Sequence, residues 1–248
     1  MLEKYRFLSG NTLKILAAVF MVIDHVGLMF FPSKIIFRNI GRLAFPIFAF
    51  MISEGAKYTK NKLRYFLLMF SLATVCQLVY FFFDNGSLYM CILVTFSLSI
   101  LLIYSLWWTK KAIFSSECKT YEKILAPFTF LSLLIGIYFL NGVLEIDYGF
   151  AGICVPLFAS LFDFRGIEAP KAIKKLDLLP LRILCLAIGL FILASSAQRN
   201  QFYSLFACLI LLLYSGKRGK YKMKYFFYLF YPLHLVLLEA IYLLIHYV

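Results

Sequence analysis

Charged side chains are scarce in this sequence: Asp, Glu, Lys and Arg make up 15% of its 248 residues, and only 12 residues are acidic. Soluble domains average about a quarter charged and about half apolar residues. Here 63% of the residues are hydrophobic and the mean hydropathy is +0.87. A water-soluble monomer of this size cannot bury so much apolar chain. The scarcity of charge therefore excludes a soluble globular protein.

Several signatures of soluble catalysis and metal binding are also missing. The six cysteines are scattered, with no CxxC pair and no histidine at a zinc-ligand spacing, which argues against structural zinc and against a disulfide framework. The chain has no glycine-rich phosphate loop, no nucleophile elbow and no convincing internal repeat. We expect no metal cofactor, and we expect the functional site to lie inside the membrane.

The apolar residues come in blocks, most of them roughly 17 to 23 residues long, the length that crosses a hydrocarbon core of about 30 Å. We predict an all-α integral membrane protein: a single domain, residues 1–248, folded as a polytopic bundle of about nine (8–10) transmembrane helices. The sixth and eighth blocks are short, and one of them could be re-entrant. The predicted blocks are 12–31, 36–56, 65–83, 88–108, 124–140, 148–162, 178–194, 202–214 and 225–247.

The net charge of +13 would fit a nucleic-acid binder, but its distribution indicates membrane topology instead. With the N-terminus in the cytoplasm and the blocks alternating, 21 of the 25 basic residues fall on the cytoplasmic side, as the positive-inside rule requires. The four that fall on or near the outside are Lys34, Arg38, Arg42 and Arg199. We predict a cytoplasmic N-terminus, an external C-terminus and no nucleic-acid partner.

Ionisable side chains inside membrane spans are costly, so each one is a candidate functional residue. The first block contains Asp24 and His25 and lacks a small-residue cleavage site, which indicates a retained helix rather than a cleaved signal peptide. Lys14 precedes His25 by eleven residues, so the two share one helical face about 16 Å apart along the axis. A positive group at the cytoplasmic mouth and a titratable base deep in the bundle thus lie on one line.

A second group of charges opens the second block. Arg38 and Arg42 are four residues apart, with Asn39 beside the first, so the two arginines stack on one face at the outer membrane level. We predict an Asp24–Arg42 ion pair, which could serve structure alone, while Arg38 could simply reach the interface. His25 could likewise be a packed, hydrogen-bonded histidine.

Three weaker candidates lie elsewhere in the chain. Asp147 and Tyr148 open the sixth block from outside, where they could face an acceptor or cap the helix. His234 follows a proline that should kink the last block, so it could be a second functional histidine or hydrogen-bond near the kink. Glu54 precedes Lys57 by three residues, which predicts a local ion pair.

Several segments of the sequence resemble the TraX family, most strongly in the first 60 residues. They are 9–16 (SGNTLKIL), 24–25 (DH), 38–50 (RNIGRLAFPIFAF), 54–55 (EG), 147–149 (DYG) and 231–235 (YPLHL). The founding member of that family is the conjugation-system enzyme that acetylates the N-terminus of pilin. The family is similar to the acyltransferase-3 superfamily, whose first helix carries Arg or Lys, ten residues and then His, as Lys14 and His25 do here.

The resemblance implies an acyltransferase of the bacterial cytoplasmic membrane that moves an acyl group, expected to be acetyl, from cytoplasmic acyl-CoA to an amine or hydroxyl at the outer side. It implies that His25 is the general base and that Lys14 contacts the acyl-CoA, while Arg42, held by Asp24, would stabilise the tetrahedral intermediate. The acceptor could be a peptide N-terminus, a sugar or a lipid head group. The expected substrate-binding residues are Arg38, Asn39, Asp147, Tyr148 and His234.

The same buried charges suit a second class of protein, a small proton-coupled transporter or flippase. In that case a proton relay would use Asp24, His25, Arg42, His234 and Glu239. The inverted repeats and glycine-broken helices of transporters are not evident in the sequence. A third class, a structural membrane subunit, leaves the buried charges unexplained. Release of CoA from labelled acyl-CoA, with and without His25, would separate the first two classes.

Overall fold

The computed structural model describes residues 5–83, 89–221 and 223–247. These residues form helices joined by turns, with two isolated β-bridges and no strand among them, so the all-α prediction is confirmed. Six of the described helical segments are long and apolar enough to cross a membrane. They are Gly10–Phe30, Ile35–Tyr58, Lys62–Val79, Ile92–Phe114, Thr120–Val143 and Leu179–Ser196.

The number of about nine spans is not confirmed. The sixth predicted block becomes α7 (Gly149–Ala159), an apolar helix of 11 residues. The eighth becomes a 3-10 helix, η2 (Arg199–Phe206), followed by the six-residue α10 (Ala207–Leu212). The ninth lies within α11 (Lys224–Tyr247), of which Leu229–Ile245 is a shorter apolar helix. Leu88, the predicted start of the fourth block, lies outside the described residues.

The chain divides into two compact units. Unit 1 contains Met1–Met51 and Leu190–Val248, and unit 2 contains Ile52–Gly189. The boundaries fall inside α3 (Ala44–Tyr58) and α9 (Leu179–Ser196). That residues 1–248 form one domain stays a prediction.

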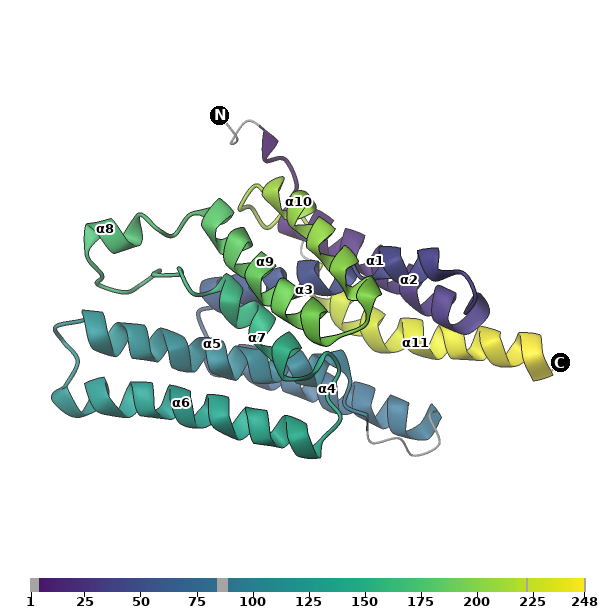
Figure 1. Cartoon of the computed structure of the whole chain (residues 1–248), viewed down its shortest axis with the longest axis horizontal. Coiled ribbons are helices and arrows are strands. Elements are labelled where there is room, and N and C mark those ends of the chain that lie inside the picture. The colour runs from purple at the N-terminus through teal and green to yellow at the C-terminus, as the bar shows by residue number, and fades with distance from the viewer. Residues whose placement is uncertain (1–4, 84–88, 222, 248) are drawn as a thin grey trace. The chain divides into compact units, whose positions relative to one another are not determined.

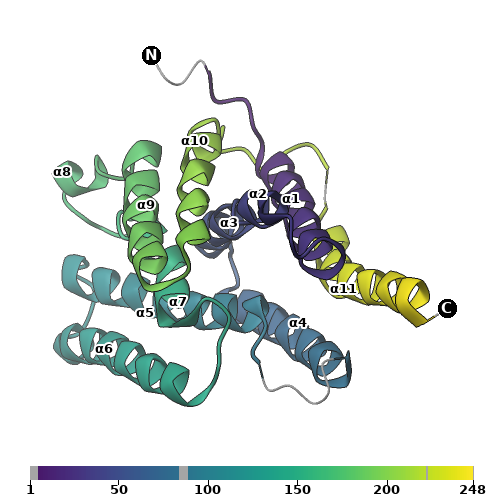
Figure 2. The same cartoon turned by 45° about the vertical axis from the view of Figure 1, so that its right-hand side comes forward.

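Unit 1 is built on α1 (Gly10–Phe30), which begins where the Ser9 hydroxyl accepts a hydrogen bond from the Thr12 N–H at 3.2 Å. The next helix, α2 (Ile35–Gly41), packs against α1 and against η2. Two glycines allow the close approach of α1 and α2, because a Cβ at Gly27 would collide with Phe37 and one at Gly41 would collide with Asp24. The last helix, α11, also packs against α1, as Figures 1 and 2 show.

The predicted second block is not one continuous helix. Its first part is α2, and the chain turns at Arg42 and Leu43 before α3 begins. The Arg42 N–H donates to the Arg38 carbonyl at 3.1 Å, and the Leu43 N–H donates to the Ile40 carbonyl at 3.1 Å. The second bond has the tight i to i+3 pattern that often ends a helix. Pro46, in the first turn of α3, has no N–H and suits a helix start. The turn places Arg42 at a helix terminus.

Unit 2 is organised around α5 (Ile92–Phe114). This helix packs against α4 (Lys62–Phe83), α6 (Thr120–Val143) and α7, and Figure 1 shows α5 and α6 side by side. The buried Ser99 hydroxyl lies 2.7 Å from the Ile153 carbonyl and so links α5 to α7. A short helix, α8 (Lys171–Lys174), precedes α9.

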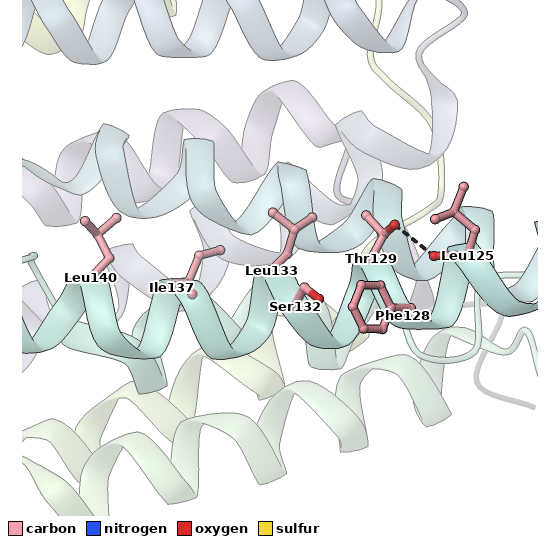
Figure 3. Close-up of a pocket in the computed structure, with 8 residues that line it drawn as sticks. Leu125, Phe128, Thr129, Ser132, Leu133, Ile137 and Leu140 are labelled. Carbon is pink, nitrogen blue, oxygen red and sulfur yellow. Dashed lines mark hydrogen bonds between the residues drawn. The ribbon is translucent and has the colours of Figure 1, made fainter.

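An apolar groove of about 390 Å³ follows one face of α6 (Figure 3). Its lining residues recur every three or four positions, as one helix face requires. They are Leu125, Phe128, Thr129, Ser132, Leu133, Gly136, Ile137 and Leu140. None of them is ionisable, and the Thr129 hydroxyl already donates to the Leu125 carbonyl at 2.8 Å. The groove is therefore an apolar helix face without a group that could act as an acid, a base or a metal ligand.

Buried ion pairs in unit 2 join α3 to α9 and to the segment that precedes α9, and they differ from the prediction. Arg182 on α9 donates to Glu54 at 2.5 Å, to the Ser53 hydroxyl at 3.2 Å and to the Ala159 carbonyl at 3.0 Å. Lys57 contacts Asp177 at 2.7 Å. The predicted Glu54–Lys57 pair is therefore wrong. A purely local pair would have left the buried guanidinium of Arg182 without a counter-charge, which is far more costly than separate pairs.

Candidate functional site

His25 lies on α1 with a half-buried side chain. Its ring Nδ1 is 2.8 Å from the Met21 carbonyl oxygen. A carbonyl can only accept a hydrogen bond, so Nδ1 carries the proton and, in the neutral ring, Nε2 presents a lone pair. The local helix geometry thus fixes His25 in the tautomer that a general base requires.

The ring of His25 meets the ring of His234 on α11. The two ring centroids are 5.2 Å apart and the rings meet edge to face at 84°. His234 is 5% exposed, its Nδ1 bonds to the Phe230 carbonyl at 3.1 Å, and its Nε2 is buried with no hydrogen-bond partner. Two imidazoles in the same tautomer therefore lie together inside unit 1.

Lys14 lies on the same face of α1 as His25, as predicted. Its Nζ is 5.8 Å from the ring centroid of Phe227, which precedes His234 by seven residues, or about two turns of α11. Both α1 residues therefore contact α11 at successive levels. Arg218 lies within electrostatic range of Lys14 and adds a second cation at this level.

An apolar cavity of about 260 Å³ lies between α1 and α11 beside this line of residues. Phe230, one of its lining residues, stacks on the His234 ring with centroids 5.2 Å apart. The other lining residues are Ile15, Ala18, Val19, Val22, Ile23 and Phe226. A flexible apolar chain would find a matching surface here, next to the histidines.

Asp24 forms its ion pair with Arg38, not with Arg42 as predicted. The Arg38 Nη1 lies 2.6 Å from the Asp24 Oδ2, and both side chains are partly buried. Asp24 packs directly against the Gly41 backbone, and Arg38 is three residues before Gly41, on the same helical face. Arg42 is rotated about 100° from Gly41. The wrong partner followed from assigning Arg38 to the membrane interface, which left Arg42 as the partner of Asp24.

Arg42 consequently keeps hydrogen-bonding capacity. Its Nε is buried and has no hydrogen-bond partner, although the guanidinium remains within electrostatic range of Asp24. The Oδ1 atoms of Asn39 and Asp24 are buried and unpartnered as well. Because buried polar atoms are almost always hydrogen-bonded, this concentration suits the binding of a polar or charged group.

The 3-10 helix η2, which packs against α2, adds three more such atoms. They belong to Asn200, Gln201 and Ser204, and the last two side chains are fully or almost fully buried. Seven of the eight unpartnered buried side-chain atoms of the described residues thus lie in unit 1. The polar groups of α1, α2, η2 and α11 define the candidate site.

Asp147 and Tyr148 belong to unit 2, where their contacts are structural. The Asp147 carboxylate accepts a hydrogen bond from the Tyr89 hydroxyl at 2.7 Å, and its carbonyl accepts one from the Thr95 hydroxyl at 2.7 Å. Tyr148 caps α7 with a left-handed backbone, φ +60°, a strained conformation for a non-glycine residue. The role of both residues in substrate binding stays a prediction.

Comparison with known proteins assigns the chain to a family. The profile of the TraX family, described as TraX protein, matches residues 9–242. The chain belongs to the TraX family. An uncharacterized protein of Rickettsia prowazekii (strain Madrid E) is 44% identical over 54 residues, 22% of this chain and 21% of that protein. The match thus spans about a fifth of the relative's length. No solved structure matches the chain.

Sequence reasoning missed some residues of this TraX-family site. Gln201 and Ser204 drew no attention because a polar residue at the start of a short block is ordinarily interfacial. The approach of His234 to His25 depends on how α11 packs, which no local pattern encodes. The buried ion pair of Arg182, which lies in unit 2 and outside this site, had a signal in the sequence: a charge inside an apolar block. Among the described residues, no group of three His, Cys, Asp or Glu could hold a metal ion.

We expect Ser204→Ala to leave the melting temperature of the TraX-family protein unchanged or higher, because the hydroxyl it removes is buried without a partner and such a group is costly. The matched control is Ser99→Ala, which removes a buried hydroxyl that is bonded and should cost about 0.5–1.5 kcal/mol. Thermal unfolding in detergent distinguishes the two. An equal loss of stability in both variants contradicts the assignment.

Proposed function

We propose that this TraX-family protein is a membrane-embedded acyltransferase that moves an acyl group, most simply acetyl, from cytoplasmic acyl-CoA to an amine or hydroxyl acceptor at the outer side of the bacterial cytoplasmic membrane. The observation that carries the proposal is the geometry of His25. Its Nδ1 is fixed on the Met21 carbonyl at 2.8 Å, and its ring meets His234 on the α1 face that also bears Lys14. Membership of the TraX family supports it.

In the proposed reaction, His25 Nε2 accepts the proton of the attacking amine or hydroxyl, since neutral imidazole is a base near neutral pH. The acceptor atom forms a bond to the thioester carbonyl carbon. The carbon–sulfur bond then breaks, and the protonated His25 returns the proton to the departing CoA thiolate. The products are the acylated acceptor and CoA, and the histidine ends in its starting state.

Arg42 is the proposed stabiliser of the negative charge that develops on the carbonyl oxygen. Its buried Nε has no hydrogen-bond partner, and a donor already held in a site with little water stabilises such charge at low reorganisation cost. The Asp24–Arg38 pair, joined at 2.6 Å, would position α2 against α1. The unpartnered groups of Asn39, His234 and η2 would hydrogen-bond the acceptor.

The line from Lys14 to His25 fits the acyl donor. Lys14 would contact the phosphates of CoA as a point charge, and the apolar cavity beside Ala18 and Phe230 would receive the chain of the donor. The charge distribution supports a cytoplasmic N-terminus, which puts Lys14 at the inner end of α1, and an external C-terminus. The acyl group would then cross the membrane while CoA stays inside.

A proton-coupled transporter or flippase is the second candidate function. One observation favours it: the helix predicted over the second block is broken at Arg42 and Leu43, and discontinuous helices line the binding sites of many transporters. The two candidates differ in their products. An acyltransferase releases CoA from acyl-CoA, and a transporter releases none.

We expect Lys14→Ala to raise the KM for acetyl-CoA much more than it lowers kcat, because the variant loses a contact with the donor and keeps the reacting groups. Lys14→Arg is the matched control and should be tolerated, since it keeps the positive charge. The measurement is release of free CoA from acetyl-CoA by membranes that contain each variant. An unchanged KM in Lys14→Ala contradicts the proposed donor path, and no release by the wild-type protein contradicts the proposed function.

A further inference from the structure

Another cavity, of about 200 Å³, lies in unit 2. It is lined by residues of α3, α4 and α5 and of the segment that follows α7. Four of the lining side chains are basic: Lys57, Lys62, Lys110 and Arg165. Asp163 is the single acidic residue among those that line it. The cavity therefore carries an excess of positive charge.

The internal ion pairs neutralise only part of that charge. Lys57 is balanced by Asp177 at 2.7 Å and Asp163 at 3.5 Å. Within the described part of the chain, Lys62, Lys110 and Arg165 form no ion pair. Lys110 donates instead to the Ser160 carbonyl at 2.9 Å. Three cations that these ion pairs leave unmatched thus surround the cavity, with Asp163 in electrostatic range of Lys62 and Lys110.

Aromatic rings contact all three of these cations, and the Lys110 Nζ lies 4.9 Å from the ring centroid of Phe164. The Lys62 Nζ lies 2.8 Å from the ring centroid of Trp107 and 5.4 Å from that of Tyr104, and the Arg165 guanidinium lies 4.2 Å from the Tyr58 centroid. Such contacts stabilise a cation without neutralising it. The Tyr104 hydroxyl, also in the cavity lining, is buried with no hydrogen-bond partner. The cavity therefore offers charge together with an unused polar group.

We propose that this cavity binds the phosphate group of a soluble cytoplasmic ligand. A phosphate dianion matches the unneutralised charge of Lys62, Lys110 and Arg165, and lysine and arginine are the side chains that bind phosphate. The Tyr104 hydroxyl can donate to a phosphate oxygen. The positive-inside rule puts these basic helix ends at the cytoplasmic face. The site does not depend on acyl transfer at His25, and an anionic lipid head group carries the same phosphate chemistry.

Trp107 is a built-in reporter for the test, because the chain has only two tryptophans. In a full-length Trp108→Phe protein, placed in phosphatidylcholine nanodiscs, pyrophosphate should change the Trp107 emission saturably as Lys62 turns toward the anion. Calorimetric titration gives the Kd independently. Lys62→Gln and Arg165→Gln should each raise that Kd at least about tenfold, the effect of one charge-assisted hydrogen bond. Lys123→Gln, an exposed lysine outside the cavity lining, should leave it unchanged.

Nanodiscs that contain phosphatidylglycerol identify the source of the phosphate. A pyrophosphate response that persists there supports a soluble ligand. A response that disappears there, and is present in phosphatidylcholine, shows that the lipid head group occupies the cavity and overturns the soluble source. Absence of saturable binding in phosphatidylcholine, or equal affinity in Lys62→Gln, Arg165→Gln and Lys123→Gln, overturns the site itself.

Discussion

His25→Ala should lower the rate of acyl transfer by about 10²- to 10⁴-fold, the usual effect of removing a general base. The protein should stay folded and still bind acyl-CoA, because the smaller side chain leaves no buried unpaired charge. The one hydrogen bond known to be lost, from Nδ1 to the Met21 carbonyl, is worth about 0.5–1.5 kcal/mol. Transfer rate, acyl-CoA affinity and melting temperature are measured on the same preparation.

Asp24→Asn is the contrasting variant on the neighbouring residue. It removes the carboxylate charge that Arg38 contacts at 2.6 Å and strands a partly buried guanidinium, so melting temperature and activity should fall together. The two variants therefore separate the general base from the residue that maintains the local structure. Near wild-type turnover in His25→Ala would contradict the enzyme hypothesis and favour the transporter.

Arg182→Met should lower the free energy of unfolding by about 3–5 kcal/mol, the range seen when one partner of a buried ion pair is removed. Arg182 and Glu54 are 5% and 7% exposed at their side chains. Loss of the guanidinium also removes the hydrogen bonds to the Ser53 hydroxyl and the Ala159 carbonyl. Thermal unfolding in detergent measures the change.

The double variant Glu54→Leu, Arg182→Met tests whether the stranded carboxylate is the cause. Apolar replacement of both partners of a buried pair is often neutral or stabilising, so the double variant should recover most of the loss. Arg64→Met, at an exposed arginine on α4, is the matched control and should change stability little. A single Arg182→Met variant as stable as Arg64→Met would show that the pair contributes nothing.

The helical fold and the face shared by Lys14 and His25 could be predicted because both depend on local regularities. Composition and block length specify helices in lipid, and eleven residues make about three helical turns whatever packs against the helix. The contacts of Lys14 with Phe227 and of His25 with His234 follow from that shared face. The identity of α11 as the partner does not follow from it, since it depends on packing between distant segments.

The ion-pair partners could not be predicted for the same reason. Glu54 and Lys57 have suitable spacing for a local pair, yet each binds a residue more than a hundred positions away. Sequence spacing ranks partners by local geometry, whereas burial requires that every charge be balanced at once. The partner of Asp24 was predicted wrongly because it depends on a close backbone contact between α1 and α2. The glycine at position 41 brings the α2 backbone against Asp24, and that contact selects Arg38 over Arg42.

The eighth block shows where hydropathy alone fails. Its apolar residues suggest a short span, but the structure forms η2 and the six-residue α10. Gln201 and Ser204 bury polar groups there, which is tolerated at membrane depth only where irregular backbone is buried in protein or lines a cavity. Hydropathy alone therefore predicted neither the number of long helices nor the polar residues of η2 in the candidate site.

Inverted membrane vesicles from producing cells expose the cytoplasmic face outward and carry the cell's own acceptors. Acetyl-CoA labelled on its acetyl group is supplied outside, and free CoA outside is compared with label attached to acceptors in the lumen. The proposed function predicts one CoA released outside for each acetyl group recovered inside, with both lost in His25→Ala. Lumenal acceptors that stay unlabelled, with no CoA released by the wild-type protein, would contradict it.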